Sequence, residues 1–66
     1  MEITINGKSS EYSGPPTLGE LLRFLGIDQK KVAVERNLKI IVQSQLEGET
    51  VEQGDAFEII RLVGGG

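Results

Sequence analysis

The chain contains one stretch with the period of an amphipathic helix, and this stretch limits what the rest of the fold can be. Its apolar residues recur at spacings of three and four and therefore share one helical face: Leu18, Leu21, Leu22 and Leu25. Thr17, followed by Glu20 three residues later, predicts a capping box at the start of the helix. Gly26 suits the left-handed position that ends a helix. We expect a helix over residues 18–25 whose single apolar face covers another element.

The N-terminus has the pattern of a β-hairpin. Residues 1–6 alternate apolar and polar side chains, which is typical of a strand with one buried face. Asn6-Gly7 follows directly, and this dipeptide is the strongest short signal for a two-residue hairpin turn, because both positions need a positive φ. Such a turn would pair Ile5 with Lys8 and return residues 8–12 as a more polar strand, which we expect at the sheet edge.

Three later segments have the pattern of strands: residues 32–36, 39–42 and 56–63. The turn before the last strand is predicted by Gly54-Asp55. Alternation within that strand places Phe57 and Ile59 on the side facing the helix. The same alternation places Ile60 and Leu62 on the opposite side.

The predicted order is two strands, one helix, two strands and a final strand. The first and last strands are the most apolar, so a central parallel pair with the hairpins outside would bury both. This is the α+β arrangement of the β-grasp, or ubiquitin-like, architecture. It has a mixed sheet of four or five strands and one main helix, residues 18–25, packed on one face. We expect one domain, residues 1–63, followed by a flexible glycine tail, residues 64–66.

A chain of 66 residues has room for one small core, and here the core must rest on aliphatic packing. There is no cysteine for a disulfide, and without cysteine or histidine a zinc site is not expected. The apolar residues available for the core are Ile3, Ile5, Leu18, Leu21, Leu22, Leu25, Val32, Val34, Ile40, Ile41, Val42, Phe57, Ile59, Ile60, Leu62 and Val63.

Charge and hydropathy disfavour several classes of function. The formal net charge is −3, which argues against nucleic-acid binding, because phosphate recognition depends on clustered Lys and Arg. No apolar run approaches the roughly 20 residues that span a bilayer, and no signal-peptide pattern opens the chain. We therefore expect a cytoplasmic protein that binds neither nucleic acid nor membrane and is a monomer in isolation.

The body of the chain offers no catalytic group and no metal site. The chain has no His or Cys, the residues most often used for acid–base and nucleophilic catalysis. No plausible base is adjacent in sequence to any of the serines, which are Ser9, Ser10, Ser13 and Ser44. The acidic residues of the last loop lack the alternating spacing of a calcium loop, so we expect them to be solvated: Glu47, Glu49, Glu52 and Asp55. We expect no catalytic residue, no metal and no bound cofactor in this chain.

The remaining candidate is the C-terminus, where an apolar strand runs into Gly64-Gly65-Gly66. Three interpretations remain open from the residues alone. The glycines are a frayed end or cloning remnant, a linker whose continuation is missing, or a functional tail. Glycine has no Cβ, so such a tail could pass through a channel too narrow for other residues.

The whole chain resembles the ThiS family, the sulfur carrier proteins of thiamine (thiazole) biosynthesis. The resemblance rests on the order and spacing of short motifs: Asn6-Gly7, Thr17-x-x-Glu20-Leu21-Leu22, Val32-Ala33-Val34-Glu35-Arg36-Asn37, Ile40-Ile41-Val42, Gly54-Asp55 and Val63-Gly64-Gly65-Gly66. Two positions depart from the family pattern. Gln43-Ser44 replaces the usual Pro-Arg pair, and Leu46 stands where many members have an aromatic residue.

The resemblance implies that the carboxylate of Gly66 is the reactive group. A ubiquitin-activating-like adenylyltransferase would use MgATP to convert it to an acyl-adenylate. Sulfur from a cysteine desulfurase or a related donor would then replace AMP. The resulting thiocarboxylate would supply sulfur to thiazole synthase, and Gly64 and Gly65 would be the narrow approach to both active sites. The chain would therefore be a co-substrate carrier and not an enzyme.

The partners of such a carrier need a surface to bind. We expect it on the exposed side of the last strand, where Ile60 and Leu62 alternate with Glu58, because an apolar patch rimmed by charge is typical of an interaction site.

Three other functions fit the same features. The small subunit of molybdopterin synthase resembles the chain in fold and ending but is usually longer. A ubiquitin-like modifier would use the tail to form isopeptide bonds to lysines. A β-grasp binding module would carry inert glycines.

Overall fold

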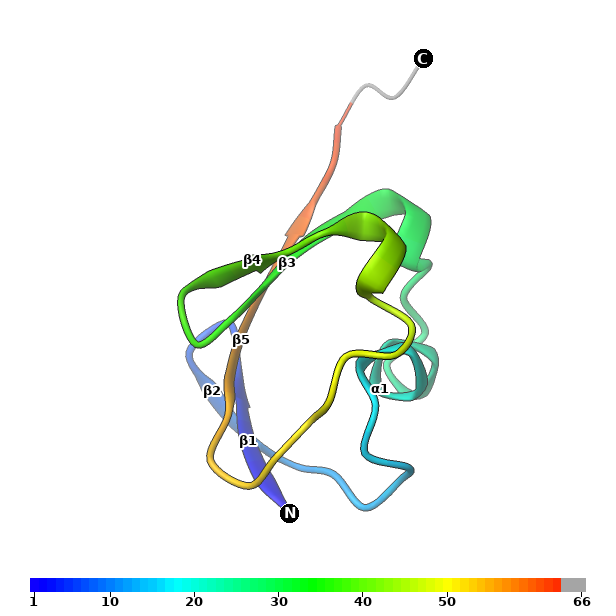
Figure 1. Cartoon of the computed structure of the whole chain (residues 1–66). Helices are drawn as coiled ribbons and strands as arrows, with labels where there is room; N and C mark the ends of the chain where they lie inside the picture. Colours follow the sequence, from blue (N-terminus) through cyan, green and yellow to red (C-terminus); the bar gives the residue numbers. More distant parts are fainter. Residues whose placement is uncertain (64–66) are drawn as a thin grey trace.

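The computed structural model describes residues 1–63, and the predicted tail of residues 64–66 lies outside them. Figure 1 shows a twisted sheet with one short helix across one face, and the last strand pointing out of the body at one end. The elements are β1 (Glu2–Ile5), β2 (Lys8–Glu11), α1 (Leu18–Phe24), η1 (Gln29–Lys31), β3 (Val32–Arg36), β4 (Lys39–Ile41), η2 (Gln43–Gln45) and β5 (Ala56–Arg61).

The sheet confirms the predicted β-grasp topology. Its strand order is β2-β1-β5-β3-β4, with β1 and β5 as the central parallel pair and the two hairpins outside. Asn6 and Gly7 have φ values of 50° and 83°, and Ile5 pairs with Lys8, as the two-residue turn predicts. The polar strand β2 is at the edge, also as predicted.

The start of α1 differs from the prediction, because no capping box forms. Thr17 occupies the N-cap position, but its side chain makes no capping hydrogen bond. The N–H groups of Leu18 and Gly19 donate instead to the carbonyls of Glu49 and Glu47, at 2.7 and 3.2 Å. A Cβ on Gly19 would lie 2.5 Å from the carboxyl carbon of Glu47. A glycine in the first turn therefore lets a distant loop approach and satisfy the first two N–H groups of the helix. The N–H of Thr17, which would donate to Glu20 in a capping box, donates to the carbonyl of Pro15 at 2.8 Å instead.

The end of α1 follows the prediction. Gly26 has a φ of 72°, the N–H of Ile27 donates to Leu22 and that of Gly26 donates to Arg23, which together form a Schellman motif. The helix ends one residue earlier than predicted. Leu25 is its C-cap and is exposed, so the predicted apolar face loses its last member.

The core lies between the sheet and the layer formed by α1 and the loop of residues 46–51. It contains Ile3, Tyr12, Leu18, Leu21, Leu22, Val32, Val34, Leu46, Val51 and Phe57. Tyr12, Leu46 and Val51 were absent from the predicted core. Besides Leu25, five residues in the predicted core are exposed instead: Ile40, Val42, Ile60, Leu62 and Val63. The reason is the single helical layer, which covers one face of the sheet and leaves the other open.

None of the helices within residues 1–63 has the length and apolar content needed to cross a bilayer.

Candidate docking face and base of the C-terminal strand

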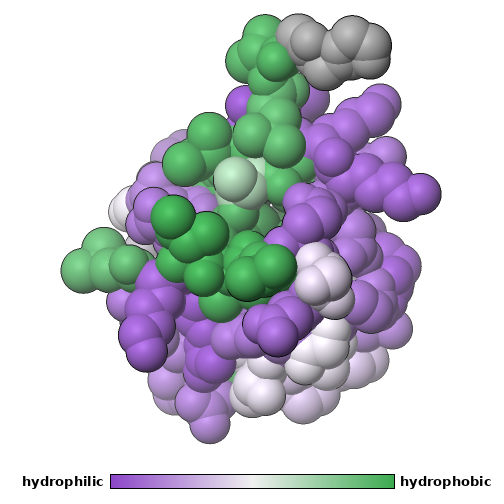
Figure 2. Space-filling model, turned by 45° about the horizontal axis from the view of Figure 1, so that its top comes forward, coloured by the Kyte–Doolittle hydropathy of each residue, from purple (hydrophilic) through white to green (hydrophobic). Residues whose placement is uncertain are grey.

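The open face of the sheet carries an exposed apolar patch. We define the outer patch as Ile40, Val42, Ile60 and Leu62, whose exposed fractions run from 51% for Ile60 to 76% for Ile40. Figure 2 shows the hydrophobic residues gathered on this side of the molecule, with an extension toward the end of the described chain. A contiguous apolar surface of this kind is typical of a protein-binding site.

Strand register brings residues from three strands into this face. Glu35 of β3 pairs with Ile40 of β4 on one side and with Glu58 of β5 on the other. Ile60 pairs with Ala33 in the same way. The outer patch is therefore flanked by two carboxylates that lie in one row across the sheet.

The predicted docking residues occupy this face. Glu58, Ile60 and Leu62 are exposed on the side of β5 away from α1, as alternation predicts; that a partner binds there stays a prediction. The sequence reasoning missed Ile40 and Val42, which it assigned to the core. In the run Ile40-Ile41-Val42 every residue is apolar, so alternation could not say which face each one takes. The register with β3 decides it.

The last strand is held firmly up to Leu62. The side-chain amide of Asn6 donates to the carbonyl of Ile59 at 3.2 Å and accepts from its N–H at 2.7 Å. This amide therefore continues the parallel pairing with β5 one position past the end of β1, within the hairpin turn. On the other side, Leu62 donates its N–H to the carbonyl of Lys31 at 2.9 Å. Gly64, Gly65 and Gly66 lie outside the described residues, so their predicted roles stay predictions.

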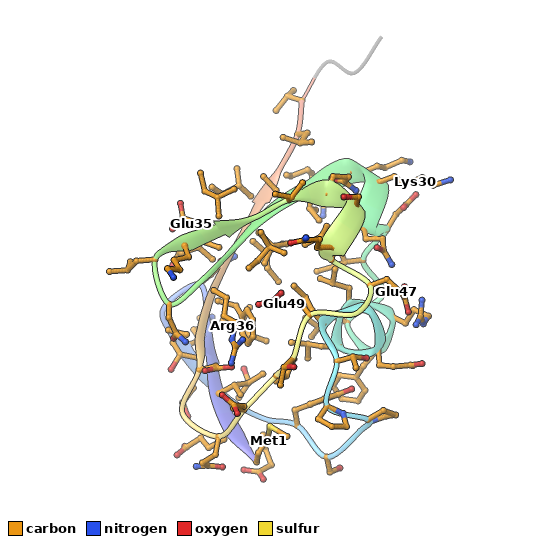
Figure 3. The ribbon with its side chains drawn as sticks, in the orientation of Figure 1. Met1, Lys30, Glu35, Arg36, Glu47 and Glu49 are labelled. Carbon is orange, nitrogen blue, oxygen red and sulfur yellow. The ribbon has the colours of Figure 1, made fainter. Side chains whose placement is uncertain are left out.

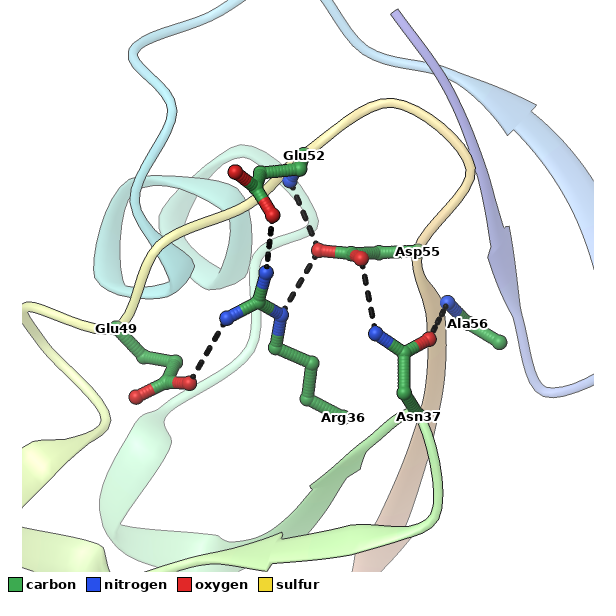
Figure 4. A network of polar contacts seen from close by, with 6 residues as sticks. All are labelled: Arg36, Asn37, Glu49, Glu52, Asp55 and Ala56. Atoms are coloured by element: carbon green, nitrogen blue, oxygen red, sulfur yellow. Dashed lines mark hydrogen bonds and ion pairs between the residues drawn. The ribbon is translucent and has the colours of Figure 1, made fainter.

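A network of charges centred on Arg36 fixes the turn that precedes β5 (Figure 4). The guanidinium donates to Asp55 at 2.9 Å, to Glu49 at 3.2 Å and to Glu52 at 2.9 Å. Asp55 also accepts from the side chain of Asn37 at 2.9 Å and from the backbone N–H of Glu52 at 2.8 Å. Figure 3 shows Arg36 reaching from the sheet toward the loop that carries Glu49.

This network holds Asp55 in its charged form. Burial alone would raise the pKa of the Asp55 carboxyl, which is only 6% exposed. The hydrogen bonds from Asn37, the backbone of Glu52 and Arg36 outweigh burial and keep that pKa below its ordinary value. The pKa of Arg36 is raised, chiefly by its hydrogen bond to Asp55. The turn thus rests on charged partners that satisfy one another.

The prediction that the carboxylates of the acidic loop are solvated is therefore wrong. Asp55 is buried and paired with Arg36, and Glu49 and Glu52 share the same guanidinium. Glu47 pairs with Arg23 of α1, and this hydrogen bond lowers its pKa to about 2, with a further contribution from Gln29. In residues 1–63 no three His, Cys, Asp or Glu side chains come together as a metal site would require. The prediction that these carboxylates are solvated missed their arginine partners, which lie 13 to 24 residues away in the chain.

Comparison with known proteins decides the family. The model of the ThiS family matches residues 3–66 of the chain. The chain belongs to the ThiS family. The family resemblance seen in the motifs is thereby confirmed.

Solved structures agree in fold over the whole chain. The crystal structure of the thiamine biosynthesis protein ThiS from Geobacter metallireducens is 36% identical, with a TM-score of 0.84 over all of both chains. The solution structure of a thiamine biosynthesis protein from Geobacter metallireducens has a TM-score of 0.77.

Sequence relatives are of two lengths. A thiazole synthase from Paramagnetospirillum magneticum is 44% identical over 66 residues, and the chain spans only 20% of its length. The uncharacterized protein ycf40 of Porphyra purpurea is 32% identical, and the chain covers 93% of it. A ThiS-family region therefore occurs in these relatives both as most of a small protein and as part of a larger one.

The structure explains why several family motifs recur together in this ThiS-family chain. Arg36-Asn37 and Gly54-Asp55 were matched as separate motifs, and their side chains contact one another directly. Asn37 also accepts from the N–H of Ala56 at 2.9 Å. These motifs position β5, whereas the outer patch stays exposed on the open face of the sheet.

Proposed function

We propose that this chain is the sulfur carrier of thiamine biosynthesis and that it carries sulfur on the carboxyl group of Gly66. The observation that carries the proposal is the family match over residues 3–66, which runs through the whole glycine segment. An exposed apolar face beside the strand that leads to this segment supports it.

The chemistry requires activation by a partner, because the negative charge of a carboxylate makes its carbon a poor electrophile. A carboxylate oxygen of Gly66 attacks the α-phosphorus of MgATP on an adenylyltransferase of the ubiquitin-activating type, and pyrophosphate leaves. A persulfide supplied by a cysteine desulfurase or a related donor then attacks the acyl carbon, and AMP leaves. Cleavage of the resulting S–S bond by a thiol gives the thiocarboxylate, which supplies sulfur to thiazole synthase.

This chain contributes geometry and recognition to that sequence, and the catalytic groups and the nucleotide site belong to its partners. Asn6 and Lys31 hold β5 on both sides, so the glycine segment starts from a rigid base. Because glycine has no Cβ, Gly64 and Gly65 would let the chain end enter a channel too narrow for other residues. The occurrence of a similar region within a thiazole synthase supports a shared pathway with that enzyme.

Intact mass spectrometry tests the function directly. The protein is incubated with the adenylyltransferase, MgATP and a sulfur source, and we expect one oxygen at the C-terminus to be replaced by sulfur. A second ThiS-family carrier of known competence serves as the control for enzyme activity. If the control is loaded and this chain is not, the sulfur-carrier function is wrong. Conjugates to lysine side chains would instead indicate a protein modifier.

Charging the outer patch is expected to weaken the adenylation step. Ile60→Glu places a carboxylate at the centre of the apolar face, and we expect the KM for the carrier to rise about tenfold or more, since a central interface residue contributes about 2 kcal/mol. The fold should survive, because Ile60 is half exposed. Steady-state pyrophosphate release measures the effect.

Ser13→Glu is the matched control for Ile60→Glu. It adds the same charge at an exposed loop position outside the sheet, and its KM should stay close to that of the unmodified chain. Equal KM values for the two variants would remove the outer patch from the binding surface.

A further inference from the structure

The end of the molecule from which β5 emerges carries a concentration of positive charge. Lys30, Lys31 and Arg61 form no ion pair within residues 1–63, whereas Arg23 and Arg36 are each paired with carboxylates there. The nearby acid is Asp28, which caps the backbone N–H of Lys30 at 2.9 Å. This end therefore has a local charge of +2 in a chain whose net charge is −3.

Two of these cations, Lys31 and Arg61, border a hollow on the inner side of β5, and Lys30 precedes Lys31 in the chain. Two adjoining cavities of about 210 and 200 Å³ share Ile27, Val32 and Arg61. Ile5 and Ile59 add to the apolar floor, and Lys31 stands at the rim. Figure 3 shows Lys30 at this end, pointing away from the body. We call the two cavities with Lys30, Lys31 and Arg61 the basic trough.

The basic trough and the outer patch flank the same strand from opposite sides. Ile60 and Leu62 point to the open face, and Ile59 and Arg61 point to the trough. Leu62 also lines a third hollow with Asp28, Lys30 and Lys31, so the two surfaces meet just past the end of β5. A partner that surrounds the emerging chain would meet an apolar surface on one side and a cationic one on the other.

The short reach of the tail brings the basic trough against any enzyme that acts on Gly66. Three residues beyond Val63 span at most about 11 Å when fully extended. The mouth of the partner's channel must therefore lie within that distance of Val63 when the carboxyl group reaches the reacting atoms. Cations pressed against a partner without counter-charges would lose hydration with no compensation.

We propose that the basic trough binds an acidic surface at the channel mouth of the adenylyltransferase. This inference rests on the proposed function, because it takes Gly66 as the group that enters the channel. Charge complementarity at a channel mouth raises the rate of productive encounter and selects one orientation of the partners. Here charge complementarity would fix how the carrier is rotated about the axis of β5. An apolar patch alone defines this rotation poorly.

The test is single charge reversal with a matched control. Lys31→Glu and Arg61→Glu remove the trough's charge, and Lys8→Glu makes the same change on the edge strand β2, where Lys8 pairs with Ile5 at the level of Phe57. All three variants change the net charge from −3 to −5. We expect kcat/KM for pyrophosphate release to fall about tenfold at low ionic strength for the two trough variants and less than twofold for Lys8→Glu.

The effect should shrink as salt is raised, because the Debye length falls from about 30 Å at 0.01 M to about 10 Å at 0.1 M. Arg61→Lys should retain most of the activity. If the trough variants match Lys8→Glu at every salt concentration, or lose activity equally at all of them with lower thermal stability, the inference is wrong. If the unmodified chain is not adenylated at all, the proposed function fails and this inference with it.

Discussion

Removal of Gly66 is expected to abolish sulfur loading while the domain stays folded. The truncated chain still ends in a glycine carboxylate, but that carboxylate falls short by one residue, about 3.5 Å. A misplacement of about 1 Å can cost a factor of about 100 in rate, so a shift of this size should leave no detectable thiocarboxylate. Intact mass spectrometry after incubation with the adenylyltransferase, MgATP and a sulfur source measures the result.

Two properties of the truncated chain, its thermal stability and its binding to the adenylyltransferase, serve as controls. Val63 is almost fully exposed, and within residues 1–63 the hydrogen bond nearest the chain end is the one donated by Leu62, so the thermal midpoint should not change. The outer patch and the basic trough are intact, so the truncated chain should compete with the full chain for the adenylyltransferase. Loading of the truncated chain at the normal rate would show that Gly66 is not the acceptor of sulfur.

Replacement of Arg36 by alanine is expected to destabilise the fold by about 2–3 kcal/mol. The loss leaves the buried carboxylate of Asp55 beside Glu49 and Glu52 with no cation between them. Breaking a fully buried pair costs about 3–5 kcal/mol, and the 19% exposure of the Arg36 side chain reduces this figure. For a domain of this size we expect the thermal midpoint to fall by about 10 °C or more. Thermal and urea unfolding followed by circular dichroism measure it.

Arg23→Ala is the matched control, because it also removes one arginine that is paired with more than one carboxylate. Arg23 is 51% exposed, and water screens its pairs with Glu20 and Glu47, so its loss should change stability much less. Equal losses of unfolding free energy in Arg36→Ala and Arg23→Ala would show that burial of the Arg36 network does not increase its contribution to stability.

The loss of stability caused by Arg36→Ala, measured against the unmodified chain, is expected to depend on pH. The pKa of Asp55 is lower in the folded chain than in the unfolded chain, so its contribution to stability is present above pH about 4 and is lost as pH falls through the folded pKa. The difference in unfolding free energy between the unmodified chain and Arg36→Ala should therefore be largest near neutral pH and should narrow toward pH 3. A difference that is constant with pH would mean that Arg36 acts through packing and not through charge.

Local sequence rules worked where one or two residues decide the geometry. Asn6-Gly7 set the hairpin and its register, and Gly26 set the end of α1, because positive φ angles are easily reached by few residue types. The capping box failed although its residues are present. The N–H of Thr17, which would donate to Glu20 in a capping box, donates to the carbonyl of Pro15 instead. The N–H groups of Leu18 and Gly19 donate to the carbonyls of Glu49 and Glu47, which lie about 30 residues away in the chain.

Some features of the candidate site could also be predicted from local sequence, and others depend on long-range contacts. The alternation of residues in β5 correctly predicted that Ile60 and Leu62 are on the exposed face. It could not predict the face of Ile40, because Ile40 begins a run of three apolar residues. The charges of the last loop could not be paired from sequence, because Arg36 is 19 residues away from Asp55 in the chain. The basic trough depends on the same kind of long-range contact, since Lys31 and Arg61 belong to segments 30 residues apart.

By itself, the sequence determined the order of elements, the hairpin turn, the end of the helix and the family, because these depend on local sterics and on the spacing of motifs. Only the tertiary structure decided which apolar residues are covered, which carboxylates are paired and which cations stand at the end of β5. The physical reason is that burial and charge pairing depend on the neighbours that the fold brings together. A sheet covered on one face leaves Ile40, Val42, Ile60 and Leu62 open beside the strand that leads to Gly66.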